Sequence, residues 1–305
     1  MKLFMKRFIL FPFFLSQILL YAQPVRPNSL AIVLAGLPRG TNETAVEFER
    51  AVLRPLRTAN ISIDVFAAVY RADAHHWHHW FERATVVEPT VVYIEDAVPI
   101  TAEQSYFSTC SNPGNIRIYH NHYSNLEIAW KAVERSSKSY VWVMKCRNDH
   151  IYHPQQTFKP CWLRELPENV ILATDKESHR TARWNEYGRG RQVASFVPEV
   201  HFPVMTSDAM FTGRFASMKR LLTIDSTPAL SADACLDPRL VHDLQGAKPC
   251  PDSAPMFQIE HRVADHIFRA NMSIHATSFQ ANHFNRSQSW LNTPCFICYD
   301  CAHHG

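Results

Sequence analysis

The sequence predicts an α/β fold with a mostly parallel central sheet. Apolar runs at Leu30–Ala35, Ile61–Tyr70 and Tyr140–Met144 have the length and composition of buried strands. Segments with the periodicity of a helix separate these runs, and such alternation is typical of a parallel sheet. Charged residues follow directly on the last run, as expected at the carboxyl end of a strand, where open α/β sheets bind their ligands.

A unit of strand, loop, helix and strand opens the predicted domain. The run Leu30–Ala35 is closed by Gly36, and Leu37–Gly40 has the Pro and Gly of a tight turn. Ile61–Tyr70 is the second strand of the unit. Because a helix connects the two strands, we expect them to form a parallel pair.

The helix between these strands is expected to take its N-cap from Thr41–Thr44. Pro55 should end or bend the helix, because proline has no amide proton to donate. One apolar face is expected to pack on the sheet, and its residues are Ala45, Phe48, Val52 and Leu56.

The middle of the chain continues the alternation. Val91–Ile94 and Val170–Ala173 are predicted to be short strands, and Asn125–Glu134 is predicted to be a helix. The face of this helix that should pack on the sheet consists of Leu126, Ala129, Trp130 and Val133.

The last third of the chain is expected to add two helices. An extended segment at 202–213 leads into the first of them, and Met256–Ile267 marks the second. The first helix is expected to bury one face that contains Phe211, Phe215, Met218 and Leu222.

The N-terminus is predicted to direct the chain into the secretory pathway. A basic start precedes a mainly apolar stretch, Phe8–Ala22, which is typical of a signal peptide or a short signal anchor. The stretch is shorter than the ~20 residues of a usual spanning helix, which favours cleavage. We therefore predict a signal segment at 1–22, a linker at 23–29 and a single lumenal domain at 30–305.

Two further patterns agree with exposure to an oxidising lumen. The eight cysteines are an even number, as full disulfide pairing would require. Four segments have the form of N-glycosylation acceptors, and their asparagines are Asn42, Asn60, Asn271 and Asn285.

Two segments raise the question of metal binding. His75–Trp80 contains four histidines, and i,i+4 spacing on a helix can bring two imidazoles to one ion. The two tryptophans and the lack of an HExxH spacing favour an amphipathic helix surface instead. The Cys295–Cys301 run has spacing that suits zinc, but disulfides are the stronger interpretation in an oxidising compartment.

Charge and length limit the classes of function. The formal net charge of the 305 residues is +3, and the basic residues are dispersed along the chain. A nucleic-acid-binding protein usually carries a basic stripe, so we expect no nucleic-acid partner. The length is sufficient for a sizeable core and is compatible with one large α/β domain or two small ones.

The stretch Ser139–Tyr152 carries the clearest chemical signal. Its apolar strand ends in Arg147 and Asp149, at the place where a sheet of this class binds ligands. A guanidinium suits a phosphate, and a carboxylate suits a metal ion. The alternative is a solvated ion pair in a loop, and the two interpretations remain open at this point.

Four motifs occur in order and together cover most of residues 30–275. They are Ala31-Ile-Val-Leu-Ala-Gly36-Leu-Pro-Arg39-Gly, Val141-Trp-Val-Met-Lys-Cys-Arg147-Asn-Asp149, Ser207-Asp208-Ala-Met-Phe211-Thr-Gly213 and Pro255-Met-Phe-Gln-Ile-Glu260. This set resembles a family of uncharacterised glycosyltransferases of the GT-A, nucleotide-diphosphosugar type. The resemblance implies a GT-A-like, Rossmann-type three-layer sandwich with a mostly parallel central sheet.

The resemblance also implies roles for individual residues. Asp149 would hold a divalent cation, Mn²⁺ or Mg²⁺, and Gly36, Arg39 and Arg147 would bind the nucleotide sugar. Together the cation and the arginines would neutralise the charge that develops on the leaving diphosphate.

Two carboxylates are candidates for the catalytic base. Asp208 or Glu260 would accept the proton of the attacking sugar hydroxyl. The structural alternative for Asp208 is an N-cap on the following helix. For Glu260 the alternative is a carboxylate on the solvent side of a helix.

The predicted function is therefore transfer of a sugar from a nucleotide-sugar donor to a glycan or glycoconjugate in the Golgi or ER lumen. The protein would be a type II membrane protein if the N-terminal segment is retained, and secreted if it is cleaved. A secreted glycan-binding or structural protein that keeps the fold without catalysis is the first alternative. A lumenal protein that binds metal through the histidine-rich segment is the second.

Overall fold

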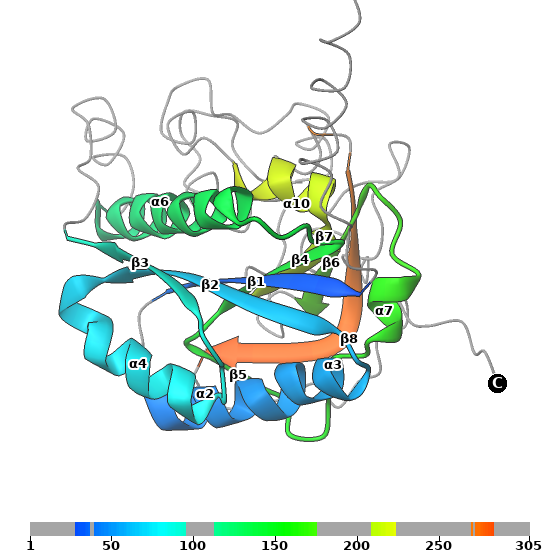
Figure 1. Cartoon of the computed structure of the whole chain (residues 1–305), viewed down its shortest axis with the longest axis horizontal. Helices are drawn as coiled ribbons and strands as arrows, with labels where there is room; N and C mark the ends of the chain where they lie inside the picture. Colours follow the sequence, from blue (N-terminus) through cyan, green and yellow to red (C-terminus); the bar gives the residue numbers. More distant parts are fainter. Residues whose placement is uncertain are drawn as a thin grey trace, which may run out of the picture.

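The computed structural model describes residues 28–36, 40–95, 113–175, 209–223, 270 and 272–283. This part of the chain has an α/β fold, as the sequence predicts (Figure 1). A mostly parallel sheet has the strand order β3-β2-β1-β4-β7-β6-β8, and the short strand β5 is attached at its β8 edge.

The parallel half of the sheet contains the predicted strands. The strand β1 lies between β2 and β4 and runs parallel to both, and β3 lies parallel beside β2. The parallel pairing predicted for the first two strands is therefore confirmed. The bounds are Ser29–Ala35 for β1, Ser62–Tyr70 for β2, Thr90–Ile94 for β3 and Trp142–Arg147 for β4.

The other half of the sheet contains mixed pairings. The strand β7 runs antiparallel to both β4 and β6, whereas β8 is parallel to β6 and antiparallel to β5. Only β6 of these four was predicted as a strand. The bounds are His150–Tyr152 for β5, Val170–Asp175 for β6, Met210–Arg214 for β7 and Ser273–His283 for β8.

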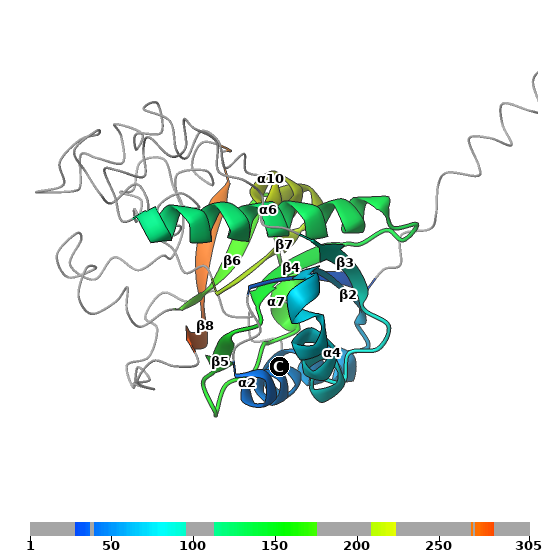
Figure 2. The ribbon, with the colours of Figure 1, turned by 90° about the vertical axis from the view of Figure 1, so that its left-hand side faces the viewer.

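Helices cover both faces of the sheet. The helices α6 and α10 lie over one face, and α2, α3, α4 and α7 lie over the other (Figures 1 and 2). Their bounds are Pro113–Arg135 for α6, Phe215–Leu222 for α10, Thr41–Phe48 for α2, Arg54–Thr58 for α3, Ala74–Arg83 for α4 and Cys161–Arg164 for α7. A short 3-10 turn at Arg71–Asp73 precedes α4.

Successive side chains of a strand point to opposite faces of the sheet, so the buried core consists of two clusters, one on each face. In β1, Leu30, Ile32 and Leu34 pack with the α2 and α4 side, while Ala31 and Val33 pack with α6 and α10. The strand is apolar at every position because both of its faces are buried, as expected in a parallel sheet. The predicted packing faces are confirmed: Ala45, Phe48, Val52 and Leu56 are buried, and so are Leu126, Ala129, Trp130 and Val133.

The start of α2 differs from the prediction. The N-cap is Gly40, in a left-handed conformation with φ 56° and without a side-chain cap. Thr44 is buried instead: its hydroxyl donates to the Gly40 carbonyl at 2.9 Å and accepts a hydrogen bond from Trp80 Nε1 at 3.1 Å. The threonine hydroxyl is thus used within the core, and Gly40 makes the turn because glycine tolerates a positive φ.

Pro55 does not end the helix, which was one of the two outcomes expected. A π-helical stretch, η1 (Glu49–Leu53), follows α2, and helical structure continues through α3 to Thr58. Pro55 lies in the first turn of α3, where the missing amide proton costs little. In the π-helical stretch, backbone hydrogen bonds join residues five apart instead of four apart, and this change comes just before the proline.

The helix predicted near residue 211 begins later. Phe211 belongs to β7, and α10 starts at Phe215. Both residues pack with Met218 and Leu222 in the core beneath α6. The apolar pattern that resembles one helical face therefore arises from the end of a strand followed by a helix.

Several predictions concern residues outside the described ranges. They include the signal segment 1–22, most of the turn 37–40, the helix 256–267 and the cysteine run 295–301. Within the described ranges, no helix is both long enough and apolar enough to cross a membrane.

Candidate functional site

The candidate site lies at the carboxyl ends of β1 and β4. These two parallel strands end together, because Ala35 and Arg147 are register partners. Gly36 follows β1 directly, and the turn after β4 carries Asn148 and Asp149. Of the predicted site residues, the structure brings Gly36, Arg147 and Asp149 together, while Arg39, Asp208 and Glu260 lie outside the described residues.

An ion pair occupies the centre of this site. The Arg147 guanidinium binds the Asp149 carboxylate through two hydrogen bonds, from Nε to Oδ1 at 2.9 Å and from Nη2 to Oδ2 at 2.8 Å. His150 Nδ1 lies 3.0 Å from Asp149 Oδ1. The three side chains come from four consecutive residues, so one turn at the end of β4 supplies all of them.

The ion pair is buried, so the solvated ion pair that the sequence left open is excluded. The side chain of Asp149 is 3% exposed and that of Arg147 is 18% exposed. Burial alone would raise the pKa of Asp149, but hydrogen bonds from His150 and Arg147, together with their charges, hold it well below its usual range. The carboxylate is therefore ionised at every physiological pH, and the pair is not solvated.

Gly36 is adapted to close contact with this turn. Its φ of +128° is a conformation that residues with a side chain rarely adopt. A methyl group at this position would lie 2.6 Å from Asn148 Oδ1 and 3.8 Å from Asp149 Oδ1. The absence of a side chain therefore allows the turn after β4 to approach the end of β1.

Asn148 and His150 were not among the site residues predicted from the sequence. Both are 1% exposed, and His150 begins β5. The available signal was the unbroken polar run from Arg147 to His150 directly after an apolar strand. Consecutive polar residues that are buried need partners or a ligand.

A free thiol lies directly beneath the site but is not suited to catalysis. Cys146 is fully buried, and burial raises its pKa to about 12 against the lowering effects of Lys145 and Tyr152. Such a thiol is not a nucleophile at neutral pH. Cys161 is in a disulfide, in agreement with the expected oxidising compartment, whereas Cys146 is a free thiol, so not every one of the eight cysteines is paired.

The histidine-rich segment forms an amphipathic helix, as its tryptophans indicate. In α4 the rings of Trp77 and Trp80 are buried, whereas all four histidines are exposed. Two of the histidines contact Glu82, His78 at 3.3 Å and His79 at 3.8 Å. No group of three histidine, cysteine or acidic side chains placed to hold a metal occurs in the described part of the chain.

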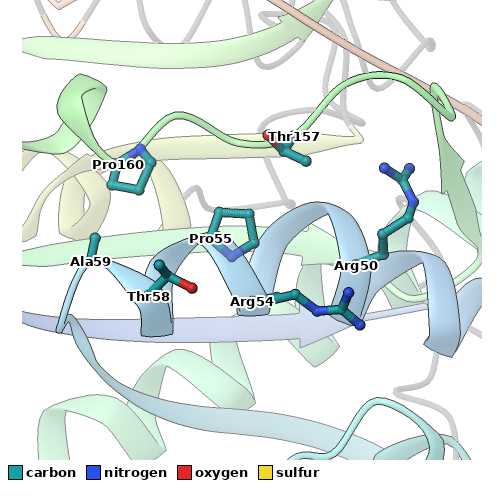
Figure 3. Close-up of a pocket in the computed structure, with 7 residues that line it drawn as sticks. All are labelled: Arg50, Arg54, Pro55, Thr58, Ala59, Thr157 and Pro160. Atoms are coloured by element: carbon teal, nitrogen blue, oxygen red, sulfur yellow. The ribbon is translucent and has the colours of Figure 1, made fainter.

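A hollow elsewhere on the surface is separate from the predicted site. It has a volume of about 500 Å³ and lies between η1, α3 and the segment before α7 (Figure 3). Thr58 and Ala59 of its wall lead into the amino end of β2, away from the carboxyl ends of the strands. The complete lining is Arg50, Arg54, Pro55, Thr58, Ala59, Thr157 and Pro160.

Of the two arginines that line this hollow, Arg50 has a structural role. Arg50 donates hydrogen bonds to Glu47 and to the carbonyls of His153 and Gln156, so it ties η1 to the segment after β5. Arg54 is largely exposed beside Glu49. None of the residues predicted from the motifs lines this hollow.

No model of a known protein family matches the chain, and no curated protein matches it either.

Replacement of Gly36 by alanine tests the contact between β1 and the turn. We expect Gly36→Ala to destabilise the protein by about 1–3 kcal/mol, because it forces a side chain into a positive-φ conformation and against Asn148. Urea unfolding measures the change. Adding Asn148→Ala should recover only the part due to contact, and full additivity of the two changes would show that the residues do not touch.

The acid dependence of stability tests the buried ion pair. Because the pKa of Asp149 is lower in the folded than in the unfolded protein, the stabilisation is present above about pH 4 and lost as pH falls below it. We expect Asp149→Asn to cost about 3 kcal/mol at pH 7. The difference between wild type and variant in urea unfolding should shrink at pH 3, and an equal difference at both pH values would contradict a low folded-state pKa.

Proposed function

We propose that the protein is a glycosyltransferase that moves a sugar from a nucleotide-sugar donor to a hydroxyl of a glycan or glycoconjugate. The observation that carries the proposal is the buried pair of Arg147 and Asp149 beside Gly36, at the carboxyl ends of two parallel strands. Ligands of open α/β sheets bind at such an edge. The finer fold assignment, a GT-A-like three-layer sandwich, belongs to the same proposal and is supported by helices on both faces of the sheet.

The chemistry of this reaction explains the residue types. The bond between the anomeric carbon and the diphosphate oxygen breaks, and a bond from that carbon to the acceptor oxygen forms. The diphosphate leaves with the bonding electron pair, and the acceptor hydroxyl gives its proton to a base. The greatest need is for positive charge beside the leaving diphosphate.

Arg147 is the cationic side chain that the described residues offer for this purpose. Its guanidinium is held in place by two hydrogen bonds to Asp149, so its orientation is set before a ligand binds. In this proposal the backbone at Gly36 lies beside the diphosphate, and Arg39, three residues later in the sequence, binds the diphosphate as well.

The proposal also includes a divalent cation, which Asp149 would hold. Mg²⁺ and Mn²⁺ are typically held by one or two carboxylates and complete their coordination with water and phosphate oxygens. Asp149 supplies a carboxylate that is ionised at neutral pH, and Asn148 supplies a buried amide oxygen next to it. When bound, such a cation would stabilise the negative charge of the diphosphate.

The remaining assignments rest on the resemblance of the motifs. We propose Asp208 or Glu260 as the base that takes the acceptor proton. Action on glycans in the Golgi or ER lumen, or outside the cell, is supported by the signal-like N-terminus and by the acceptor sequence at Asn60. Asn60 is exposed in the turn before β2, at the edge of the sheet opposite the candidate site.

Thermal unfolding in the presence of candidate donors tests this proposal. We expect UDP- or GDP-sugars to raise the melting temperature, with a larger effect when Mn²⁺ is present, whereas CMP-sugars, which carry no diphosphate, should not. A ligand at one hundred times its Kd stabilises the folded state by about 2.7 kcal/mol. Transfer of a labelled sugar from that donor to glycan acceptors then measures the activity.

Two carboxylate variants distinguish loss of the donor site from the general effect of removing a carboxylate. Asp149→Asn should abolish both the donor-dependent shift and the transfer. Asp64→Asn is the matched control, because Asp64 pairs with Lys138 and Tyr140 near the amino end of β2. If no nucleotide sugar binds, or if Asp149→Asn binds and transfers like the wild type, the proposal fails and a non-catalytic role is favoured.

A further inference from the structure

The hollow beside the π-helical stretch η1 has no role in the proposed reaction. Its volume of about 500 Å³ lies in the range of small-ligand sites, and π-helical stretches often occur at functional sites. In Figure 3, Pro55 and Ala59 point from the helix toward the segment that carries Thr157 and Pro160. The hollow therefore offers apolar rings together with a hydroxyl group.

Hydrogen bonds hold the two walls of the hollow in place. Pro55 has no amide proton for the Ala51 carbonyl four residues earlier, and the Phe158 amide donates to that carbonyl instead, at 2.8 Å. Arg50 donates to two further carbonyls of the segment that carries Phe158. Because these bonds lie within the protein, the shape of the hollow is set before any ligand binds.

The helix wall of the hollow leads directly into an exposed acceptor sequence. Ala59 lines the hollow, and Asn60 follows it as the first residue of Asn60-Ile-Ser62. Asn60 and Ser62 are both exposed, and Asn60 has a positive φ of 56°, which asparagine adopts more readily than most residues. The Asn60 amide donates to the Arg57 carbonyl at 2.9 Å, so the turn from which this side chain leaves the surface is fixed.

The other acceptor sequence within the described ranges lies elsewhere. Asn42 is in the first turn of α2, and its Oδ1 lies 3.0 Å from His79 Nε2 on α4. The hydroxyl of Thr44, the third residue of this sequence, is buried and donates to a backbone carbonyl. None of these three residues lines the hollow. A glycan at Asn42 would therefore start away from it.

We propose that Asn60 carries an N-linked glycan whose innermost sugars lie in the hollow beside it. The glycan would be attached by a host transferase, so this assignment rests on the proposed entry into the secretory pathway and not on sugar transfer by this protein. The C–H faces of N-acetylglucosamine pack on Pro55 and Pro160, and their hydroxyl and acetamido groups bond with Thr157 and with the exposed guanidinium of Arg54.

The attachment is an ordinary substitution at the first sugar. The donor is a lipid-linked oligosaccharide diphosphate of the secretory pathway. A bond forms between Asn60 Nδ2 and the anomeric carbon of the first N-acetylglucosamine, and the bond from that carbon to the diphosphate oxygen breaks. The lipid diphosphate leaves with the bonding electron pair, and the amide nitrogen loses one proton to a base of the host transferase.

The covalent link allows weak contacts to keep the sugars in the hollow. A ligand attached by a short flexible link has an effective concentration on the order of millimolar at its site. Ligands that bind only the folded state raise its stability. The glycan at Asn60 should therefore stabilise the protein, and it should cover the segment on the far wall.

Replacement of Ser62 tests this without disturbing the turn at Asn60. In full chain secreted from eukaryotic cells, Ser62→Ala removes the acceptor sequence and Ser62→Thr keeps it. Mass spectrometry should find a glycan at Asn60 in the wild type and in Ser62→Thr, but not in Ser62→Ala. We expect Ser62→Ala alone to lower the melting temperature, by about 2–4 °C.

Hydrogen exchange shows where the glycan lies. The amides of residues 157–160 should exchange more slowly in the wild type than in Ser62→Ala, because the sugars cover this wall of the hollow. Asn42→Gln is the matched control, since it removes the other described acceptor sequence. It should leave exchange at 157–160 as in the wild type.

An unmodified Asn60 in the secreted wild type would overturn the assignment. An equal melting temperature or equal exchange at 157–160 in the wild type and Ser62→Ala would overturn it as well. These failures differ from failure of the proposed function. Donor binding and sugar transfer by a chain without a glycan at Asn60 would keep the proposed function, and a glycan in the hollow of a chain that binds no nucleotide sugar would remove it.

Discussion

The buried ion pair between Arg147 and Asp149 is the constraint on which the candidate site depends. A carboxylate that is 3% exposed is tolerated only if charged hydrogen bonds replace its water, and Arg147 and His150 supply them. These residues occupy one turn at the end of β4. The register of β4 with β1 then places Gly36 against that turn, where only a residue without a side chain fits. The pairing of β1 with β4 therefore determines how the residues of the candidate site lie relative to one another.

The sequence predicts those parts of the fold that depend on local patterns. The strands β1, β2, β4 and β6 are apolar runs that both layers of helices bury, so their composition identifies them, and the partly exposed edge strand β3 is also mainly apolar. The packing faces of α2 and α6 follow from periodicity alone. Arg147 and Asp149 could be predicted as neighbours because they stand two residues apart where such a run stops.

The parts that the sequence did not predict depend on contacts between distant residues. The strand β7 lies antiparallel between β4 and β6 in the sheet. Its apolar residues and those of α10 are spaced in the sequence like one face of a helix, so β7 was not recognised as a strand. The strand β5 has three residues, and its partner β8 lies about 130 positions later. The burial of Asn148 likewise follows from its approach to Gly36, more than one hundred residues away, and not from its own neighbours.

The central claim is that the turn after β4 binds the diphosphate of a nucleotide sugar. Anomalous diffraction from crystals grown with Mn²⁺ and a nucleoside diphosphate tests it most directly. The account predicts an Mn²⁺ peak about 2.1 Å from a carboxylate oxygen of Asp149, with the diphosphate beside Arg147. A diphosphate bound at another place on the chain, with the pair of Arg147 and Asp149 untouched, would contradict it.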